Sequence, residues 1–200
     1  MRKFGMVSAA ILLAASASSA YGDELSVVCS AEQDWCDLMV AAFEAENADT
    51  DVLMVRKSTG ETLAQVRAEA GNPKIDVWWG GTGDPHLIAA EEGLTQVSDV
   101  DTSELLGWAQ NMSEISGGKT VGIYAGALGI AYNSDILSER NIAPPECWAD
   151  LEEPRLVGEI EVANPNSSGT AYTELATLVK LFGEYEAFVK LAAVGKNVNS

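Results

Sequence analysis

Asp76-Val-Trp-Trp-Gly-Gly-Thr-Gly-Asp-Pro-His86 is the stretch of this chain that decides its fold. Residues 75–79 form an apolar run with the length and composition of a buried strand. The glycine-rich residues 80–83 predict a tight loop, and Asp84 with Pro85 is typical of the cap and first turn of a helix. A buried strand that passes through a short polar loop into a helix is the repeating unit of an α/β fold.

The same succession occurs twice before this stretch. Residues 25–29 predict a strand, followed by a helix whose apolar residues repeat at helical spacing from Trp35 to Phe43. Residues 51–55 predict the next strand, and Ser58-Thr-Gly-Glu61 has the capping-box pattern of a helix that runs to about residue 70. Because these strands are almost wholly apolar, they predict a parallel sheet that is covered on both faces.

The second half of the chain repeats the pattern incompletely. A polar connection, residues 99–119, leads to two extended segments, 121–124 and 127–132, which meet at Gly126. Residues 134–140 predict a helix, residues 159–163 a strand, and residues 170–182 and 184–194 two further helices. A unit that starts about 40 residues before the end cannot close a core of its own, so we expect an N-terminal fragment of a longer protein.

The N-terminus has the layout of a secretory signal. Arg2 and Lys3 precede an apolar run over residues 7–17, and small residues follow, with cleavage expected after Ala20 or Gly22. The run is shorter than the roughly 20 residues that a bilayer span needs. A signal peptide over residues 1–22 predicts a periplasmic protein. The formal net charge of −18 argues against binding to nucleic acid or to anionic lipid surfaces.

The chain has three cysteines, which in an exported protein predict one disulfide and one remaining thiol. Cys29 and Cys36 are the expected pair, because one closes a predicted strand and the other lies early in the next helix. Closing so short a loop stabilises a fold by about 2.5 kcal/mol. Cys147 is then either a buried thiol or the partner of a cysteine outside this sequence.

Two runs of hydroxyl residues and glycine, Ser58-Thr-Gly60 and Ser167-Ser-Gly-Thr170, lead into predicted helices. Backbone N–H groups and hydroxyls at a helix N-terminus bind phosphate and carboxylate well. Each run alone is equally suited to capping its own helix. Ligands of parallel sheets bind beyond the carboxyl ends of the strands, where residues 80–83 also lie, and this favours an anion site. The candidate ligand-binding residues are Ser30, Ser58, Thr59, Gly60, Gly81, Thr82, Gly83, Asp84, Ser167, Ser168, Gly169 and Thr170.

Motifs of catalysis are lacking in this sequence. It contains no G-x-S-x-G, H-E-x-x-H or Walker motif, and His86 is its only histidine. A lone histidine is weak evidence for a metal ligand or a base, and Tyr124 and Tyr132 are equally suited to ligand contact and to core packing. We therefore expect a non-catalytic protein without a cofactor. An enzyme that uses His86 or paired carboxylates, and a sensor domain, are the remoter alternatives.

Five stretches in this order resemble one family. They are Cys29-Ser-Ala-Glu-Gln-Asp-Trp-Cys36, Arg56-Lys-Ser-Thr-Gly-Glu61, the opening stretch, Val121-Gly-Ile-Tyr-Ala-Gly-Ala-Leu-Gly129 and Asn164-Pro-Asn-Ser-Ser-Gly-Thr170. The family is that of extracellular solute-binding proteins of ABC transporters, in the branch labelled iron(III) transport binding proteins. The resemblance implies a two-lobed, type II periplasmic-binding-protein fold, with residues 23–124 as the first lobe, 125–132 as a hinge crossover and 133–200 as part of the second lobe. It also implies a monomer that closes on its ligand and delivers it to a membrane permease.

The ligand is left open between two kinds. Ferric-binding relatives carry a histidine soon after the first strand, a glutamate after the third and a tyrosine pair late in the chain, whereas residues 30–34 contain no histidine and residues 80–83 no glutamate. Hydroxyls and backbone N–H donors suit an anion, while ferric iron prefers anionic oxygen ligands. A phosphorylated sugar or a phosphonate is therefore the favoured ligand, ferric iron as transported ligand is the alternative, and no metal ligands are assigned.

Overall fold

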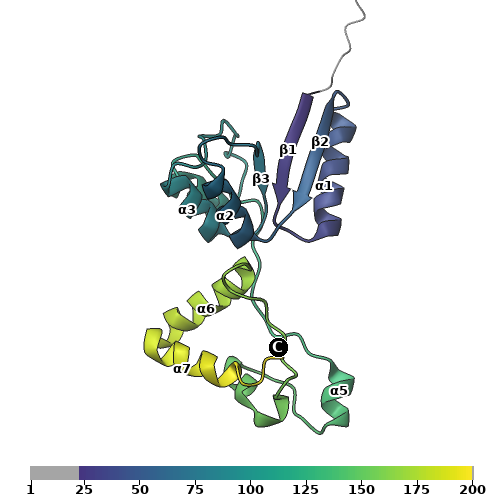
Figure 1. Ribbon diagram of the computed structural model, residues 1–200, viewed down its shortest axis with the longest axis vertical. Helices are drawn as coiled ribbons and strands as arrows, with labels where there is room; N and C mark the ends of the chain where they lie inside the picture. Colours follow the sequence, from purple (N-terminus) through teal and green to yellow (C-terminus); the bar gives the residue numbers. More distant parts are fainter. Residues whose placement is uncertain (1–22, 200) are drawn as a thin grey trace, which may run out of the picture.

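The computed structural model describes residues 23–199, so the predicted signal peptide lies outside the described residues. Figure 1 shows two bodies, one above the other, joined by a narrow connection. The upper body holds the strands and the first helices, and the lower body holds the last three α-helices. Within residues 23–199, no helix is both long and apolar enough to cross a membrane.

The upper body is built on a three-stranded parallel sheet. Its strands β1 (Asp23–Cys29), β2 (Thr50–Arg56) and β3 (Val77–Trp79) lie in the order β2-β1-β3. Val28 pairs with Val55 on one side and with Trp78 on the other. The parallel sheet predicted from the apolar strands is confirmed, and its carboxyl edge points toward the lower body (Figure 1).

Four helices belong to this body, α1 (Gln33–Glu46), α2 (Thr59–Ala68), α3 (Gly83–Glu91) and α4 (Gly107–Ile115). The capping box of Ser58 and Glu61 at the start of α2 is confirmed. The helix α4 falls in the predicted polar connection, so that prediction was wrong. Trp108, Ala109, Met112 and Ile115 lie among the polar residues of α4, and Ala109 is buried.

The sheet is covered less completely than its apolar strands predict. A core of Cys29, Ala31 and Cys36 lies under Trp35 and Trp79. However, Leu53 and Val55 of β2 are 51% and 53% exposed. Alternate residues of a strand share a face, so this face of β2 is open while α1 packs on the other. The prediction that helices cover both faces is therefore wrong for β2.

The lower body follows a connection, residues 120–133, without helix or strand, so the extended segments predicted on either side of Gly126 are not part of a sheet. It contains α5 (Ser134–Glu139), the short 3-10 helices η1 (Trp148–Glu152) and η2 (Pro154–Leu156), α6 (Gly169–Phe182) and α7 (Glu184–Val194). The strand predicted over residues 159–163 is reduced to one parallel bridge, Ile160 with Val198, because a strand needs a neighbour along its whole length.

The disulfide between Cys29 and Cys36 is present, as predicted. It links the last residue of β1 to the first turn and a half of α1 and encloses the polar loop between them. Cys147 is an exposed free thiol, which corrects the alternative of a buried thiol.

Candidate functional site

Three helix N-termini meet where the two bodies touch. Two belong to α2 and α3 of the upper body, and the third is that of α6 of the lower body. The Gly60 N–H of α2 donates to the Ser167 carbonyl oxygen at 2.9 Å, which joins the two bodies directly. We call this contact region of the α2, α3 and α6 N-termini the junction.

Glycines make the close approach at the junction possible. A Cβ atom on Gly60 would lie 2.7 Å from the Asn166 carbonyl oxygen and 2.8 Å from that of Ser167. A Cβ atom on Gly169 would lie 2.8 Å from the Thr59 hydroxyl and would also overlap that of Thr82. The two bodies therefore touch backbone to backbone at Gly60. At Gly169 the backbone of the lower body meets hydroxyl groups of the upper body.

Behind the junction lies a chain of hydroxyl groups. The Trp78 indole N–H donates to the Ser30 hydroxyl at 2.9 Å, and Ser30 and Thr62 hydroxyl oxygens lie 3.2 Å apart. The Thr62 hydroxyl donates to the Ser58 carbonyl at 3.0 Å, so the proton between Ser30 and Thr62 comes from Ser30. The Ser30 hydroxyl proton is thus donated to Thr62, within the protein. Ser30 therefore has a structural role in this arrangement, where it links Trp78 to the start of α2. Thr62 was not among the residues predicted from the sequence. Its position four residues after Ser58 could have indicated it, because a threonine hydroxyl in a helix can donate to the carbonyl four residues earlier.

Thr82 presents an unsatisfied hydroxyl at the junction. Its Oγ1 atom is buried and has no hydrogen-bond partner in the part of the chain that the structure describes. One carboxylate oxygen of Asp84, two residues further on, is also buried without a hydrogen-bond partner among the described residues. Leaving a buried polar group unpaired costs about 1–3 kcal/mol, so such groups at one helix start point to a missing partner. Thr82 supplies a donor and Asp84 an acceptor.

The glycine loop before Thr82 adopts left-handed backbone conformations, with φ of 76° at Gly80 and 91° at Gly81. A Cβ atom on Gly81 would lie 2.6 Å from the Thr59 hydroxyl, so the loop packs directly on the start of α2. His86 lies behind the loop, with its Nε2 atom 2.8 Å from the Gly80 carbonyl oxygen. Its ring stacks on Trp78 at a centroid distance of 3.9 Å.

The environment of His86 favours the neutral imidazole. Burial lowers its pKa, because desolvation penalises the charged ring more than the Gly80 carbonyl and the Asp84 carboxylate favour it. A neutral ring that holds a backbone carbonyl and stacks on an indole has a structural role in the loop. This arrangement places His86 behind the loop instead of at the junction surface.

Several predicted site residues cap their own helices in this structure. Ser58 bonds Glu61 in the capping box, and these bonds from Ser58 lower the pKa of the exposed Glu61 carboxyl. The Ser168 hydroxyl accepts from the Ala171 N–H at 3.3 Å, and Ser167 donates to the Asn164 carbonyl. Thr170 is exposed and lines the cavity of the lower body. The junction thus gathers Thr59, Gly60, Gly81, Thr82, Ser167 and Gly169, with Ser30 behind it, and the contact of these residues with ligand stays a prediction.

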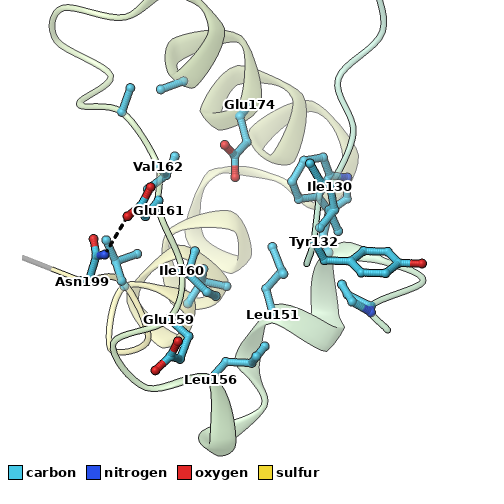
Figure 2. A pocket seen from close by; sticks show the side chains of 18 of the residues that line it. Ile130, Tyr132, Leu151, Leu156, Glu159, Ile160, Glu161, Val162, Glu174 and Asn199 are labelled. Atoms are coloured by element: carbon cyan, nitrogen blue, oxygen red, sulfur yellow. Dashed lines mark hydrogen bonds between the residues drawn. The ribbon is translucent and has the colours of Figure 1, made fainter. Parts of the chain in front are cut away.

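A large cavity lies elsewhere, inside the lower body. It measures about 790 Å³ and has mostly apolar walls, contributed by α5, α6, α7 and the segment around Ile160. Figure 2 shows the Glu174 carboxylate pointing into it from α6, and burial raises the pKa of this group. The lining holds three carboxylates, Glu159, Glu161 and Glu174, and its one cation, Arg140, is paired with Glu159. An excess of carboxylates among apolar walls disfavours an anion. The polar junction is therefore the better candidate site for the predicted anion.

Metal ligands do not gather in the described part of the chain. Within residues 23–199, no group of three or more histidine, cysteine, aspartate or glutamate side chains lies close enough to hold one metal ion.

The fold resembles solved periplasmic binding proteins along most of the chain. The periplasmic binding protein P5PA matches with a TM-score of 0.84 and 34% identity, over 89% of this chain and 57% of P5PA. The periplasmic binding protein AfuA from Actinobacillus pleuropneumoniae, with exogenous fructose-6-phosphate bound, matches with a TM-score of 0.80 and 36% identity, over 89% of this chain and 56% of AfuA. These matches confirm the predicted α/β periplasmic-binding-protein fold.

A relative in sequence covers nearly all of the chain. It is a Haemophilus influenzae protein described as uncharacterized, 41% identical over an alignment of 198 positions that covers 96% of this chain and 57% of that protein. The chain thus spans a little over half the length of the relatives it matches. Residues 88–200, more than half of the chain, match the bacterial extracellular solute-binding protein profile. The chain belongs to the family of bacterial extracellular solute-binding proteins.

Proposed function

We propose that this protein is the solute-binding component of an ABC uptake transporter and that it captures a small phosphorylated anion, a sugar phosphate or a phosphonate, at the junction. The observation that carries the proposal is the convergence of three helix N-termini on the hydroxyls of Thr59 and Thr82. Its 36% identity to a protein solved with fructose-6-phosphate bound supports a phosphorylated ligand. The protein acts in the periplasm after export by residues 1–22.

Backbone groups supply most of the attraction for an anion in this proposal. The first N–H groups of a helix lack intrahelical partners and carry a partial positive charge. Nearby, Arg56 and Lys57 are the cations of the segment, but Arg56 donates to the Ala31 carbonyl at 3.0 Å and Lys57 to the Gln65 side chain. In a chain of net charge −18, binding therefore depends on local donors at close range and not on long-range attraction.

Thr82 and Asp84 determine which phosphorylated ligand the proposed site prefers. The unpartnered Thr82 hydroxyl donates to a phosphoryl oxygen, while the unpartnered Asp84 oxygen accepts from a hydroxyl group of the ligand. A carboxylate repels an anion, so a ligand that carries hydroxyl groups beside its phosphoryl group gains more at this site. We therefore expect a sugar phosphate to bind more tightly than inorganic phosphate or methylphosphonate.

The two bodies act as the lobes of a closing receptor in this proposal, residues 23–124 and 133–200, with the crossover at 125–132. A ligand at the junction contacts α2 and α3 from one lobe and α6 from the other, so binding favours the closed arrangement. The closed form is then delivered to the permease. Ferric iron is the second candidate ligand, favoured by the buried carboxylate oxygen of Asp84. However, a hard trivalent cation needs several anionic oxygen ligands, and Asp84 supplies one carboxylate.

Calorimetry on the full chain tests this proposal, with fructose 6-phosphate, inorganic phosphate, methylphosphonate and ferric citrate as titrants. Saturable binding of fructose 6-phosphate at one site is expected. Thr82→Val removes the unpartnered hydroxyl and should weaken this binding by about tenfold or more, since a hydrogen bond to a charged group contributes about 1.5–3 kcal/mol. Thr95→Val is the matched control, because the Thr95 hydroxyl is equally buried and unpartnered outside the junction. Tight binding of ferric citrate without binding of any phosphoryl compound would overturn the proposal.

A further inference from the structure

The last residue before the crossover, Tyr124, contacts the glycine loop with its side chain. The Gly81 N–H donates to the Tyr124 hydroxyl oxygen at 2.7 Å, and that hydroxyl donates to the Gly81 carbonyl oxygen at 3.2 Å. One hydroxyl thus bonds both polar groups of the same residue. Tyr124 is 37% exposed, so burial alone does not fix its place.

The residue that Tyr124 bonds is next to the groups of the proposed site. Gly81 packs on the Thr59 hydroxyl, and the residue that follows it is Thr82, whose buried hydroxyl is unpartnered. Two consecutive glycines with positive φ lose more conformational freedom on ordering than any other residues would. A loop of this kind needs a tether if Thr82 is to keep a fixed direction.

The ring of Tyr124 is itself held in place. Its centroid lies 4.8 Å from that of Trp35 at an interplanar angle of 58°, and Trp35 meets Trp79 edge to face at 4.9 Å. Trp35 directly precedes Cys36, which the disulfide fixes to the end of β1. The hydroxyl of Tyr124 therefore extends to Gly81 from a braced aromatic cluster. Such bracing is expected for a side chain whose direction matters.

We propose that Tyr124 is a positioning residue for the ligand site, which holds the Gly81 peptide in its binding conformation and links that peptide to the crossover. This inference rests on the proposed function at the junction. A movement of the crossover when the lobes open shifts the Tyr124 hydroxyl and with it the direction of Thr82. Closure and the order of the glycine loop are thereby coupled, because each biases the other.

Tyr124→Phe tests the inference, since it removes the hydroxyl and keeps the ring against Trp35. Loss of these hydrogen bonds should weaken binding of fructose 6-phosphate by about three- to tenfold. The Gly81 amide of the ligand-free variant should exchange its hydrogen faster with solvent than in the wild type. Tyr132→Phe is the matched control, a tyrosine at the other end of the crossover that is 51% exposed, and it should change neither quantity.

The two readouts distinguish this inference from a general effect on folding and from the proposed function. A merely destabilising change would lower the melting temperature without a selective effect on the Gly81 amide. Wild-type affinity in Tyr124→Phe, or unaltered exchange at Gly81, would overturn the role of Tyr124 while leaving the proposed function intact. A wild-type chain that binds neither fructose 6-phosphate nor inorganic phosphate would overturn the proposed function and the ligand role of Tyr124 together.

Discussion

Replacing Gly60 with alanine should stabilise helix α2 and at the same time disfavour the contact between the lobes. Gly60 is the second residue of α2, and alanine is favoured over glycine in a helix by about 0.5–1 kcal/mol. The added methyl group would lie 2.7 Å and 2.8 Å from two carbonyl oxygens of the other lobe. Ordinary contacts of a methyl group are longer, and backbone carbonyls cannot rotate away as a side chain can. The same substitution therefore has opposite effects within a lobe and between the lobes.

The size of the second effect follows from the cost of overpacking. An extra methyl group in a well-packed contact costs about 1–3 kcal/mol. At about 1.4 kcal/mol per tenfold change in an equilibrium constant, the closed arrangement becomes about 5- to 150-fold less populated relative to the open one. If ligand binds in the closed arrangement, its apparent affinity falls by a comparable factor.

Two measurements on Gly60→Ala check this reasoning. Calorimetry with fructose 6-phosphate should show the loss of affinity, while the thermal midpoint stays equal to that of the wild type or rises. Spin labels on Cys147, an exposed thiol of the lower lobe, and on an engineered Glu91→Cys of the upper lobe should report a longer mean distance. Gly107→Ala, also at a helix start but with no atom within 4 Å of the new methyl group, is the matched control. Unchanged label distances and unchanged affinity in Gly60→Ala would refute the account of the junction.

Three further outcomes follow from the structure. Gly169→Ala should behave as Gly60→Ala does in the distance and affinity measurements, because its methyl group meets the Thr82 hydroxyl across the junction. Replacing both Cys29 and Cys36 with alanine should lower the free energy of unfolding, measured in urea, by about 2.5 kcal/mol, because the unfolded chain gains the entropy of an open loop. Burial lowers the pKa of His86, so the unfolded chain binds its proton more readily than the folded protein does. The stability that neutral His86 provides is present in full above its ordinary pKa of 6.5 and is lost as the pH falls through the lower folded value, so His86→Gln should flatten this dependence.

A specific result would contradict each of these three predictions. A Gly169→Ala variant with wild-type affinity would show that the lobes tolerate a side chain there. Equal urea midpoints before and after removal of the disulfide would show that the loop between Cys29 and Cys36 is already restricted in the unfolded chain. Melting curves that fall equally between pH 7 and pH 5 in His86→Gln and in the wild type would assign the pH dependence to other groups.

Local patterns predicted the sheet and the first three helices, because each of these elements is specified within its own segment. The apolar run before Gly80, the capping box at Ser58 and the pair Asp84-Pro85 each predict one element without reference to the rest of the chain. The disulfide was predictable for the same reason, since Cys29 and Cys36 lie only seven residues apart. The helix α4 was missed because it lies in a connection rich in polar residues and Ala109 is the only buried residue within the helix.

The proximity of several candidate residues was predictable, but their contacts were not. The rule that ligands bind at the carboxyl ends of parallel strands gathered Ser30, Gly60 and Thr82 correctly at one edge. No local pattern indicates that Gly60 meets Ser167 across the lobes, or that Tyr124 bonds Gly81, because these pairs lie 107 and 43 residues apart. The extended segments predicted within residues 121–132 do not join a sheet, because β-branched and aromatic residues favour extended backbone even where no neighbouring strand exists.

The central claim is that a phosphorylated anion binds where α2, α3 and α6 begin, and a titration followed by amide NMR tests it most directly. Fructose 6-phosphate added to the isotope-labelled full chain should shift the amide signals of Thr59, Thr82 and Gly169 together, with one saturating concentration dependence. These residues belong to both lobes, so a common titration curve would locate the ligand at the junction. Shifts confined to residues around the cavity of Glu174, or no shifts at all at saturating fructose 6-phosphate, would contradict the account.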